Sequence, residues 1–255
     1  QRLGKRLARG WVGTDVQWRT LRMRIGMFGT FYFLILVFVN FLISTDFGQS
    51  MVPGWRDAIF PMYHTVSGFQ AGVAAVVIAL YFSRKYMKLE KYIHLDAFWS
   101  LGRLLFALTL LWIYFFYSSF IVFWYGRSMN DIATLDLLIK GPMIYAFFAG
   151  MILLWFVPWW ILIWNKVRRG TAAMVVGSFI ILIGLLIDRI RTFVPAWSVP
   201  GDQIHEKWLK VIPETVWPDI FDILIMAGGI SLVAFIVMMM TRVIPVLSVW
   251  QVQEF

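Results

Sequence analysis

The sequence predicts an all-α integral membrane protein with six transmembrane helices. Hydrophobic residues make up 60% of the 255 residues, whereas soluble domains are about 45–50% apolar. Six apolar stretches each reach the roughly 20 residues that a helix needs to cross a bilayer, and none shows the alternation of a transmembrane β-strand. The expected spans are Ile25–Thr45, Asp57–Phe82, Asp96–Tyr125, Leu137–Trp164, Thr171–Val194 and Asp219–Met240.

The segments outside the spans differ in character. A basic lead-in carries Trp11 and Trp18, which are typical anchors at the membrane interface, and a full-length span follows it in place of a signal-peptide core. The longest loop contains several prolines, which exclude one continuous helix. Pro158 is expected to kink the fourth span or to end its regular part near the cytoplasmic face. The chain is thus expected to divide into the lead-in (residues 1–24), helices one to five (25–194), an outer loop (195–218), helix six (219–240) and a cytoplasmic tail (241–255).

The basic residues gather on one side of the predicted membrane topology. The net charge is +9, and most Lys and Arg residues lie before the first span and in the loops after the second and fourth spans. The positive-inside rule places these segments and both termini in the cytoplasm. The charge therefore indicates membrane topology and contact with anionic lipid, not binding of nucleic acid.

The residues that usually hold redox metals are scarce. The chain has no Cys and three His, so it cannot itself ligate a Cys-bound iron–sulfur cluster. A haem bound inside a helix bundle typically needs two His ligands on facing helices. His64 and His94 lie near opposite faces of the membrane, and His205 lies in the long loop. We therefore expect no metal site and no haem in this chain.

The entry into the second span carries an ionisable side chain into the membrane. Pro53-Gly54 is a turn signal, Asp57 is placed to cap the helix start, and His64 then lies roughly 10 Å deep. Imidazole titrates near neutrality, so His64 is a candidate for proton transfer or for a hydrogen bond to a quinol. The alternative is a structural hydrogen bond between helices.

A second group of charges lies near the outer ends of the fifth and sixth spans. A charge at membrane depth is costly and usually marks a functional path or an ion pair. Asp188 and Arg189 are adjacent, so they point about 100° apart and should pair with other helices. One plausible partner of Arg189 is Asp222, at the start of the sixth span. The alternatives are a polar path that opens outward and a salt bridge that fixes packing.

The third span carries further polar residues. Arg103 lies about two turns from its cytoplasmic start, where it either snorkels to the surface or serves the cytoplasmic side of a polar path. Hydroxyl and amide groups can relay protons, but they also join helices. The candidates for such a relay are Tyr114, Tyr117 and Ser118, with Thr109 and Ser119 on the same helix and Ser67 and Gln70 on the second.

Several motifs, in order along the chain, carry a resemblance to a known family. They are Pro53-Gly-Trp-Arg-Asp-Ala-Ile-Phe-Pro61, His94-Leu-Asp96 with Gly102-Arg-Leu-Leu-Phe106, Trp112-Ile-Tyr-Phe-Phe-Tyr-Ser118 with Trp124-Tyr-Gly126, Gly184 with Asp188-Arg189, and Ile244-Pro245. In these motifs the chain resembles the NrfD family of polysulfide-reductase-type membrane subunits, and within it the large membrane subunits of bacterial alternative complex III. The resemblance implies helices arranged in four-helix bundles, and the chain is similar to the C-terminal part of such subunits.

The resemblance also implies a function in a bacterial inner membrane. Such subunits belong to respiratory or photosynthetic complexes that oxidise quinol, either menaquinol or ubiquinol, and pass electrons to iron–sulfur and cytochrome c subunits. The subunit carries no redox metal and contributes to quinol binding, a proton path or both. On that basis His64, Asp188, Arg189, Asp222, Arg103 and Asp57 are the expected residues of the path or of the quinol vicinity.

Two other functions remain compatible with the residues. One is a six-helix transporter or channel, although none of the spans is interrupted as the broken helices of transporters are. The other is a structural membrane anchor whose charges only fix assembly.

Overall fold

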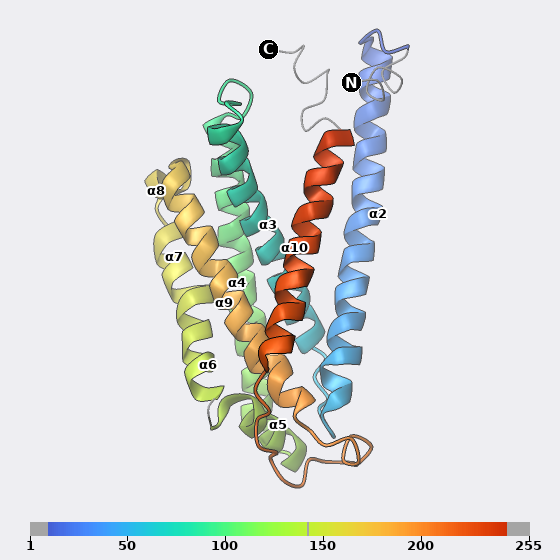
Figure 1. Ribbon diagram of the computed structural model, residues 1–255, viewed down its shortest axis with the longest axis vertical. Helices are drawn as coiled ribbons and strands as arrows, with labels where there is room; N and C mark the ends of the chain where they lie inside the picture. Colours follow the sequence, from blue (N-terminus) through green and yellow to red (C-terminus); the bar gives the residue numbers. More distant parts are fainter. Residues whose placement is uncertain (1–9, 142, 244–255) are drawn as a thin grey trace. The chain divides into compact units, whose positions relative to one another are not determined.

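A computed structural model describes residues 10–141 and 143–243, and all regular secondary structure in that part of the chain is helical, without a strand. Six of its helices are long and apolar enough to cross a membrane. The predicted fold class is therefore confirmed, and the chain is a multi-pass membrane protein (Figure 1). The first nine residues and the tail from residue 244, including the Ile244-Pro245 motif, lie outside the described residues.

The described chain contains long helices, short helices and two irregular turns. In chain order they are α2 (Asp15–Phe47), the 3-10 turn η1 (Gln49–Met51), α3 (Phe60–Tyr86), α4 (Leu95–Gly126), α5 (Met129–Ile139), α6 (Met143–Met151), the π-helical turn η2 (Ile152–Phe156), α7 (Val157–Leu162), α8 (Asn165–Arg169), α9 (Thr171–Trp197) and α10 (Ile220–Val243).

The chain divides into two compact units. One consists of the residues up to Leu36 and from Trp217 onward, which include the first part of α2 and all of α10. The other runs from Val37 to Val216 and contains the remaining elements. The second unit holds the packed core and the candidate site.

Four spans of the second unit form a helix bundle. Helix α3 packs against α4 and α9, the segment from α6 to α7 packs against α9, and α4 also contacts α7. Buried apolar side chains such as Phe98, Leu105, Trp112, Leu154 and Ile181 fill its centre. In a membrane, van der Waals packing and small residues hold helices together, and a Cβ added at Gly184 would lie 2.8 Å from the Leu153 Cβ. Gly184 therefore permits the close approach of α9 to the π-helical turn.

The helix boundaries differ from the predicted spans at several points. The first helix begins at Asp15, so the second half of the predicted lead-in is helical. The predicted span Leu137–Trp164 is divided: α5 is a separate helix capped by the Ser128 side chain, and Gly141 then adopts a φ of 61°. This left-handed conformation favours glycine and stops the helix. The membrane-crossing segment consequently runs from Met143 to Leu162.

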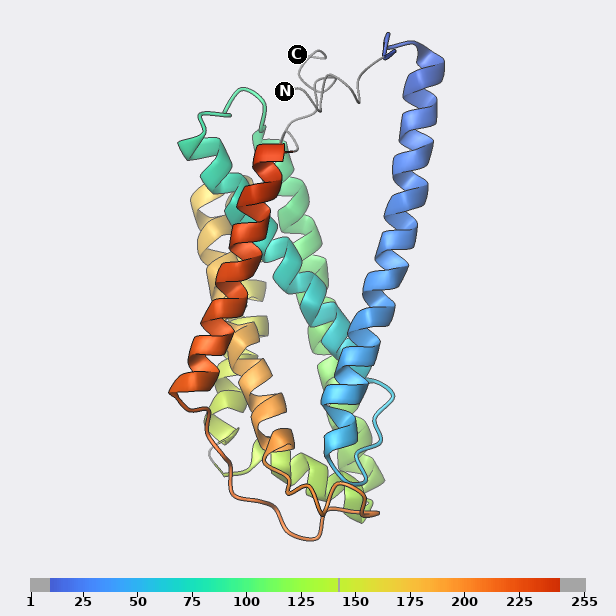
Figure 2. The ribbon, with the colours of Figure 1, turned by 45° about the vertical axis from the view of Figure 1, so that its right-hand side comes forward.

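Helix α5 lies across one end of the bundle, where α3 begins and α4 and α9 end (Figures 1 and 2). It contacts α4, α6 and α9. We call this the α5 end and the opposite end, where α8 lies, the α8 end. The sequence predicts that the α5 end faces outward and the α8 end faces the cytoplasm.

Pro158 changes the path of the α6–α7 span without ending it. A proline nitrogen has no hydrogen, so Pro158 cannot bond the carbonyl four residues earlier, which belongs to Leu154. The chain forms the π-helical turn of Ile152–Phe156 directly before this proline and then continues as α7. The predicted kink thus takes the form of a π-helical turn, which leaves the Leu154 carbonyl available to a side chain.

Candidate functional site

A polar stripe runs along one face of α3 into the bundle. Tyr63, Ser67 and Gln70 are all buried, and their spacing of four and three residues places them on the same helix face. The stripe extends about 10 Å along the helix axis. Buried polar groups in a membrane protein require partners, and the partners of this stripe come from α9, α4 and the π-helical turn.

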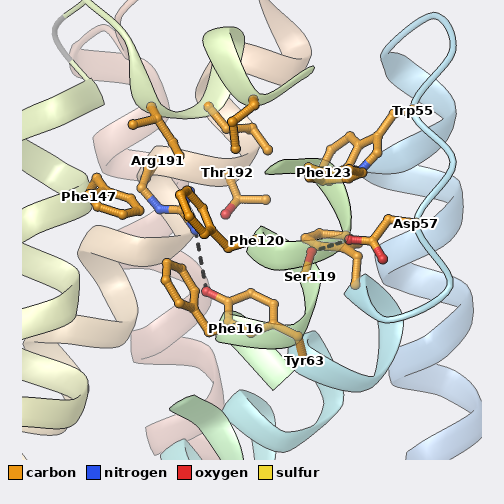
Figure 3. A pocket seen from close by; sticks show the side chains of 14 residues that line it. Trp55, Asp57, Tyr63, Phe116, Ser119, Phe120, Phe123, Phe147, Arg191 and Thr192 are labelled. Carbon is orange, nitrogen blue, oxygen red and sulfur yellow. Dashed lines mark hydrogen bonds between the residues drawn. The ribbon is translucent and has the colours of Figure 1, made fainter. Parts of the chain in front are cut away.

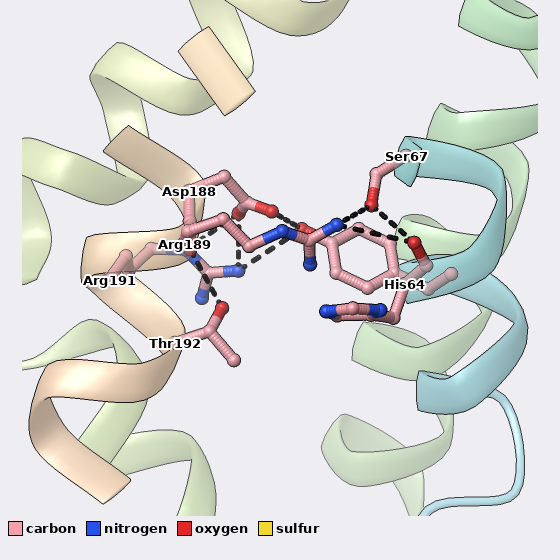
Figure 4. A network of polar contacts seen from close by, with 7 residues as sticks. His64, Ser67, Asp188, Arg189, Arg191 and Thr192 are labelled. Atoms are coloured by element: carbon pink, nitrogen blue, oxygen red, sulfur yellow. Dashed lines mark hydrogen bonds and ion pairs between the residues drawn. The ribbon is translucent and has the colours of Figure 1, made fainter. Parts of the chain in front are cut away.

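Asp188 on α9 is the centre of the buried charges. Its Oδ1 accepts hydrogen bonds from Nη2 of Arg191 at 2.9 Å and from Nε at 3.2 Å, within one turn of the same helix. Its Oδ2 accepts a hydrogen bond from the hydroxyl of Tyr63 on α3. Nη2 of Arg191 also lies 3.5 Å from that hydroxyl. Asp188, Arg191 and Tyr63 therefore form one buried cluster that joins two helices (Figure 4).

Arg189 crosses to α3 on the other side of the cluster. Its Nη2 donates to the Ser67 hydroxyl and to the backbone carbonyl of His64 at 3.2 Å, and the Ser67 hydroxyl donates to the same carbonyl at 2.7 Å. The cluster thus contains two guanidinium groups and one carboxylate. An excess of one positive charge at such depth is costly. Helix packing alone does not explain this composition.

The His64 ring lies beside this group and is buried. It packs edge-on against Phe193 of α9, with 5.7 Å between ring centres, and Arg189 reaches over it toward α3 (Figure 4). Within the described part of the chain, neither Nδ1 of His64 nor Nη1 of Arg189 has a hydrogen-bond partner. Both nitrogens are buried and polar, so each can still bind a water molecule, and the imidazole of His64 can also exchange a proton.

The stripe ends at Gln70, near the middle of the bundle. Its Nε2 lies 3.1 Å from the Thr109 hydroxyl of α4 and 3.5 Å from the Leu154 carbonyl. That carbonyl is the one released by Pro158, so the π-helical turn supplies an acceptor to the interior. The stripe therefore contacts three neighbouring elements between the α5 end and the bundle centre.

A pocket opens beside Tyr63 and Arg191 at the α5 end. Its cavity volume is about 50 Å³, so it is a narrow cleft. Figure 3 shows Tyr63 and Arg191 on one side, Asp57 and Ser119 on the other, and aromatic rings of α4 between them. The lining residues are Trp55, Asp57, Phe60, Tyr63, Phe116, Ser119, Phe120, Phe123, Leu135, Leu138, Ile139, Phe147, Arg191 and Thr192.

Asp57 lies in the turn just before α3. The N-cap of this helix is Ile59 and no side chain caps it, so the predicted capping role of Asp57 is wrong. Its Oδ1 accepts a hydrogen bond from the Ile59 amide at 2.8 Å, and its Oδ2 accepts one from the Ser119 hydroxyl. Its backbone carbonyl accepts a hydrogen bond from Gln49 Nε2 at 2.5 Å. The pocket therefore has an anchored carboxylate opposite the Tyr63–Arg191 pair.

The structure brings some of the predicted residues together. His64, Asp188 and Arg189 lie in one polar cluster, and Asp57 lines the pocket that borders it. Ser67, Gln70 and Thr109 also belong to this group of contacts.

Other predicted residues lie elsewhere. Arg103 is exposed at the α8 end, stacked on Trp99 with its Cζ 3.9 Å from the ring centre. Tyr114 and Tyr117 are 62% and 59% exposed, and the Ser118 hydroxyl donates to the Tyr114 carbonyl of its own helix. Asp222 belongs to the other unit, where its carboxylate accepts a hydrogen bond from the Asp219 amide at the start of α10.

Sequence reasoning missed two central residues, Tyr63 and Arg191. Both lie close in sequence to residues that were predicted: Tyr63 precedes His64, and Arg191 lies three positions after Asp188. The spacing of Asp188 and Arg191 indicates an ion pair on one helix face. The spacing of Tyr63, Ser67 and Gln70 indicates a polar face on α3. Neither pattern shows whether that face of the helix points into the bundle or toward the lipid.

The comparisons with known proteins agree with these observations. The sequence profile of the family described as "Polysulphide reductase, NrfD" matches residues 17–200. This range contains the whole four-helix bundle, the pocket and the buried cluster. No curated protein matches the chain.

Proposed function

Since the chain belongs to the NrfD family, whose members are membrane subunits of redox complexes, partner with iron–sulfur subunits and are associated with quinones, we propose that it carries a proton path in a quinol-oxidising complex similar to alternative complex III. The complex lies in the bacterial cytoplasmic membrane, and both termini of this chain face the cytoplasm. Its partners are iron–sulfur and cytochrome c subunits, which take the electrons.

The observation that carries this proposal is the line of buried polar contacts from the pocket to the bundle centre. Tyr63 lines the pocket and bonds Asp188, Arg189 joins α9 to Ser67 and His64, and Gln70 continues the same face of α3. Ionisable groups inside the membrane are expensive and mark proton or substrate paths. Several such groups on adjacent positions of α3 and α9 fit proton transfer better than an isolated structural pair does.

The chemistry of the path follows from its groups. Oxidation of one quinol releases two protons and two electrons; the electrons leave through the iron–sulfur partner and the protons must reach water. The Tyr63 hydroxyl accepts a proton at its oxygen and passes its own to Asp188, with which it shares a hydrogen bond. Arg191 stabilises the carboxylate between transfers. The Asp57 carboxylate lines the same pocket and is the acceptor for the second proton of the quinol.

A second function of the same pocket is binding of the quinol ring. The pocket is a narrow cleft between aromatic rings, with polar groups on two sides. A quinol is a flat ring with oxygens at opposite positions, so its hydrogen-bonding pattern matches polar groups on two sides of a cleft. The cavity of about 50 Å³ is smaller than such a ring, so binding requires the aromatic side chains that line it to move apart. Menaquinol and ubiquinol both satisfy this description.

Two other functions make different predictions. A transporter binds substrate at unwound half-helices, whereas the described spans are continuous apart from the π-helical turn. A structural anchor needs the charges only for assembly, so neutral variants of an assembled complex would keep full activity.

The test uses the assembled complex with Asp188→Asn or His64→Ala in this subunit. We expect quinol-dependent turnover and proton release to fall roughly 10- to 100-fold for Asp188→Asn, within the range for removing a proton-transfer group. Asp202→Asn, an exposed carboxylate in the long loop, is the control and should retain wild-type rates. Unchanged turnover and proton release in both test variants would favour the structural anchor.

A further inference from the structure

Three arginines gather at the α8 end of the bundle, away from the pocket. Arg103 lies on α4, and Arg168 and Arg169 lie on α8. The two helices touch at Gly102, where an added Cβ would lie 3.3 Å from the Arg168 Cβ. The close contact brings the arginines of α8 alongside the first turns of α4.

Arg168 has a structural role in this group. It donates from Nη1 to the carbonyls of Leu162 and Ile163, the second at 3.1 Å, and from Nη2 to the Asn165 side chain. These are free carbonyls at the end of α7, which basic side chains commonly satisfy. The hydrogen-bonding capacity of Arg168 is therefore largely used within the protein.

Arg103 and Arg169 are different because both are exposed and share one aromatic ring. Their guanidinium carbons lie 3.9 Å and 5.5 Å from the ring centre of Trp99. In the described ranges, the ion pairs are Lys140–Asp136, Arg191–Asp188 and Lys210–Glu206, so no carboxylate of those residues pairs with either arginine. Two like charges held close to one ring attract an anion.

The stacked geometry favours an anion with several oxygens. A guanidinium that lies on an aromatic face keeps its N–H edges available, and these match phosphate in a bidentate manner. Stacking also limits the conformations of the arginine side chain, so less entropy is lost when a ligand binds. The pair is therefore suited to a phosphate group.

The surface next to Arg103 is apolar. Ala107, Leu110, Tyr114 and Tyr117 continue along the same exposed stripe of α4, and Leu104 and Leu111 beside it are 48% and 40% exposed. A free phosphate would use only the arginines, whereas a phospholipid would also cover this stripe with its acyl chains. Trp159, Trp160 and Trp164 lie on the neighbouring segment, as in the aromatic belt at a membrane interface.

We propose that Arg103, Arg169 and Trp99 form a binding site for the phosphate of an anionic phospholipid, whose acyl chains lie along the exposed stripe of α4. The site is separate from the polar cluster and does not depend on the proton path. It differs from the general attraction of basic loops to anionic membranes, because it requires the planar guanidinium groups as well as their charge.

The test is native mass spectrometry of the assembled complex, released from micelles that contain equal amounts of phosphatidylglycerol and phosphatidylcholine. The wild type should retain phosphatidylglycerol selectively. Retention should fall roughly tenfold in Arg103→Ala/Arg169→Ala, because two basic contacts are lost. Arg127→Ala, an exposed arginine at the α5 end, is the matched control and should retain the lipid.

A charge-preserving variant separates a defined site from diffuse attraction. Arg103→Lys/Arg169→Lys keeps both charges and is less prone to misfold, and it should still lose several-fold of the retained lipid because lysine lacks the bidentate edge. Added inorganic phosphate should leave retention unchanged.

Three results would overturn the proposal. They are equal retention of both lipids by the wild type, wild-type retention in the lysine variant, and displacement by millimolar phosphate, which would indicate a site for the free anion.

Discussion

The hydroxyl of Tyr63 on α3 donates a buried hydrogen bond to Oδ2 of Asp188 on α9. The two residues are far apart in sequence but form the contact through which the pocket meets the buried charges. Arg191 binds the other carboxylate oxygen, so the Asp188 carboxylate is held from two sides. This contact is expected to contribute both to the stability of the bundle and to proton transfer.

Removing the Tyr63 hydroxyl should cost moderate stability. Tyr63→Phe keeps the ring and its contacts with Trp112 and Phe116, but it removes a hydrogen bond to a carboxylate, worth about 1–2 kcal/mol in this environment. The midpoint of thermal unfolding in detergent should fall accordingly. Tyr117→Phe, on the exposed face of α4, is the control and should leave the midpoint unchanged.

Removing Arg191 should be more harmful than removing both members of its ion pair. Arg191→Met leaves the buried Asp188 carboxylate without its hydrogen-bonded cation, because Arg189 donates to Ser67 and His64 instead. The cost should be roughly 3–5 kcal/mol. Asp188→Asn combined with Arg191→Met removes both charges and should recover much of that loss. Denaturant unfolding of the single and double variants measures the difference. A double variant as unstable as Arg191→Met would show that the pair does not act as a unit.

Gln70→Leu should distinguish a path from packing. Nε2 of Gln70 makes two long contacts, of 3.1 Å and 3.5 Å, and its Oε1 is buried without a hydrogen-bond partner among the described residues. Replacing the amide by an apolar group of similar size should therefore change unfolding stability by less than about 1.5 kcal/mol. The polar stripe of α3 would nevertheless lose its inner end. We expect proton release to slow while thermal stability stays near the wild-type value; a purely structural role predicts no change in proton release.

Gly184→Ala should weaken the bundle. The added Cβ would lie 2.8 Å from the Leu153 Cβ, which forces α9 away from the π-helical turn and costs about 1–3 kcal/mol. Gly72→Ala is the matched control, because a Cβ there meets no atom within 4 Å. The yield of assembled complex and its unfolding temperature should fall for the first variant and remain unchanged for the second.

The spans could be predicted because hydrocarbon thickness sets their length and composition. The division of Leu137–Trp164 could not be predicted in the same way, because the apolar composition continues across the break and only Gly141 marks it. The effect of Pro158 was predictable as a disturbance, but its form as a π-helical turn depends on neighbouring helices.

The sequence predicted the charged residues of the candidate site better than it predicted which residues they contact. Asp188 and Arg189 stand out because charges are rare in apolar spans, and both were expected to contact another helix; each contacts α3. Their partners Tyr63 and Ser67 depend on how α3 and α9 are rotated and aligned, which one sequence does not specify. Arg191 was overlooked because it lies closer to the helix end, where basic residues commonly reach the interface.

The most direct measurement of the central claim is the number of protons released per electron by the assembled complex in sealed proteoliposomes, with quinol as donor. The wild type and Tyr117→Phe should release protons at the same ratio and rate. Tyr63→Phe should slow proton release relative to electron transfer, because the hydroxyl that connects the pocket to Asp188 is missing. A wild-type ratio and rate in a fully assembled Tyr63→Phe complex would contradict the proposed path.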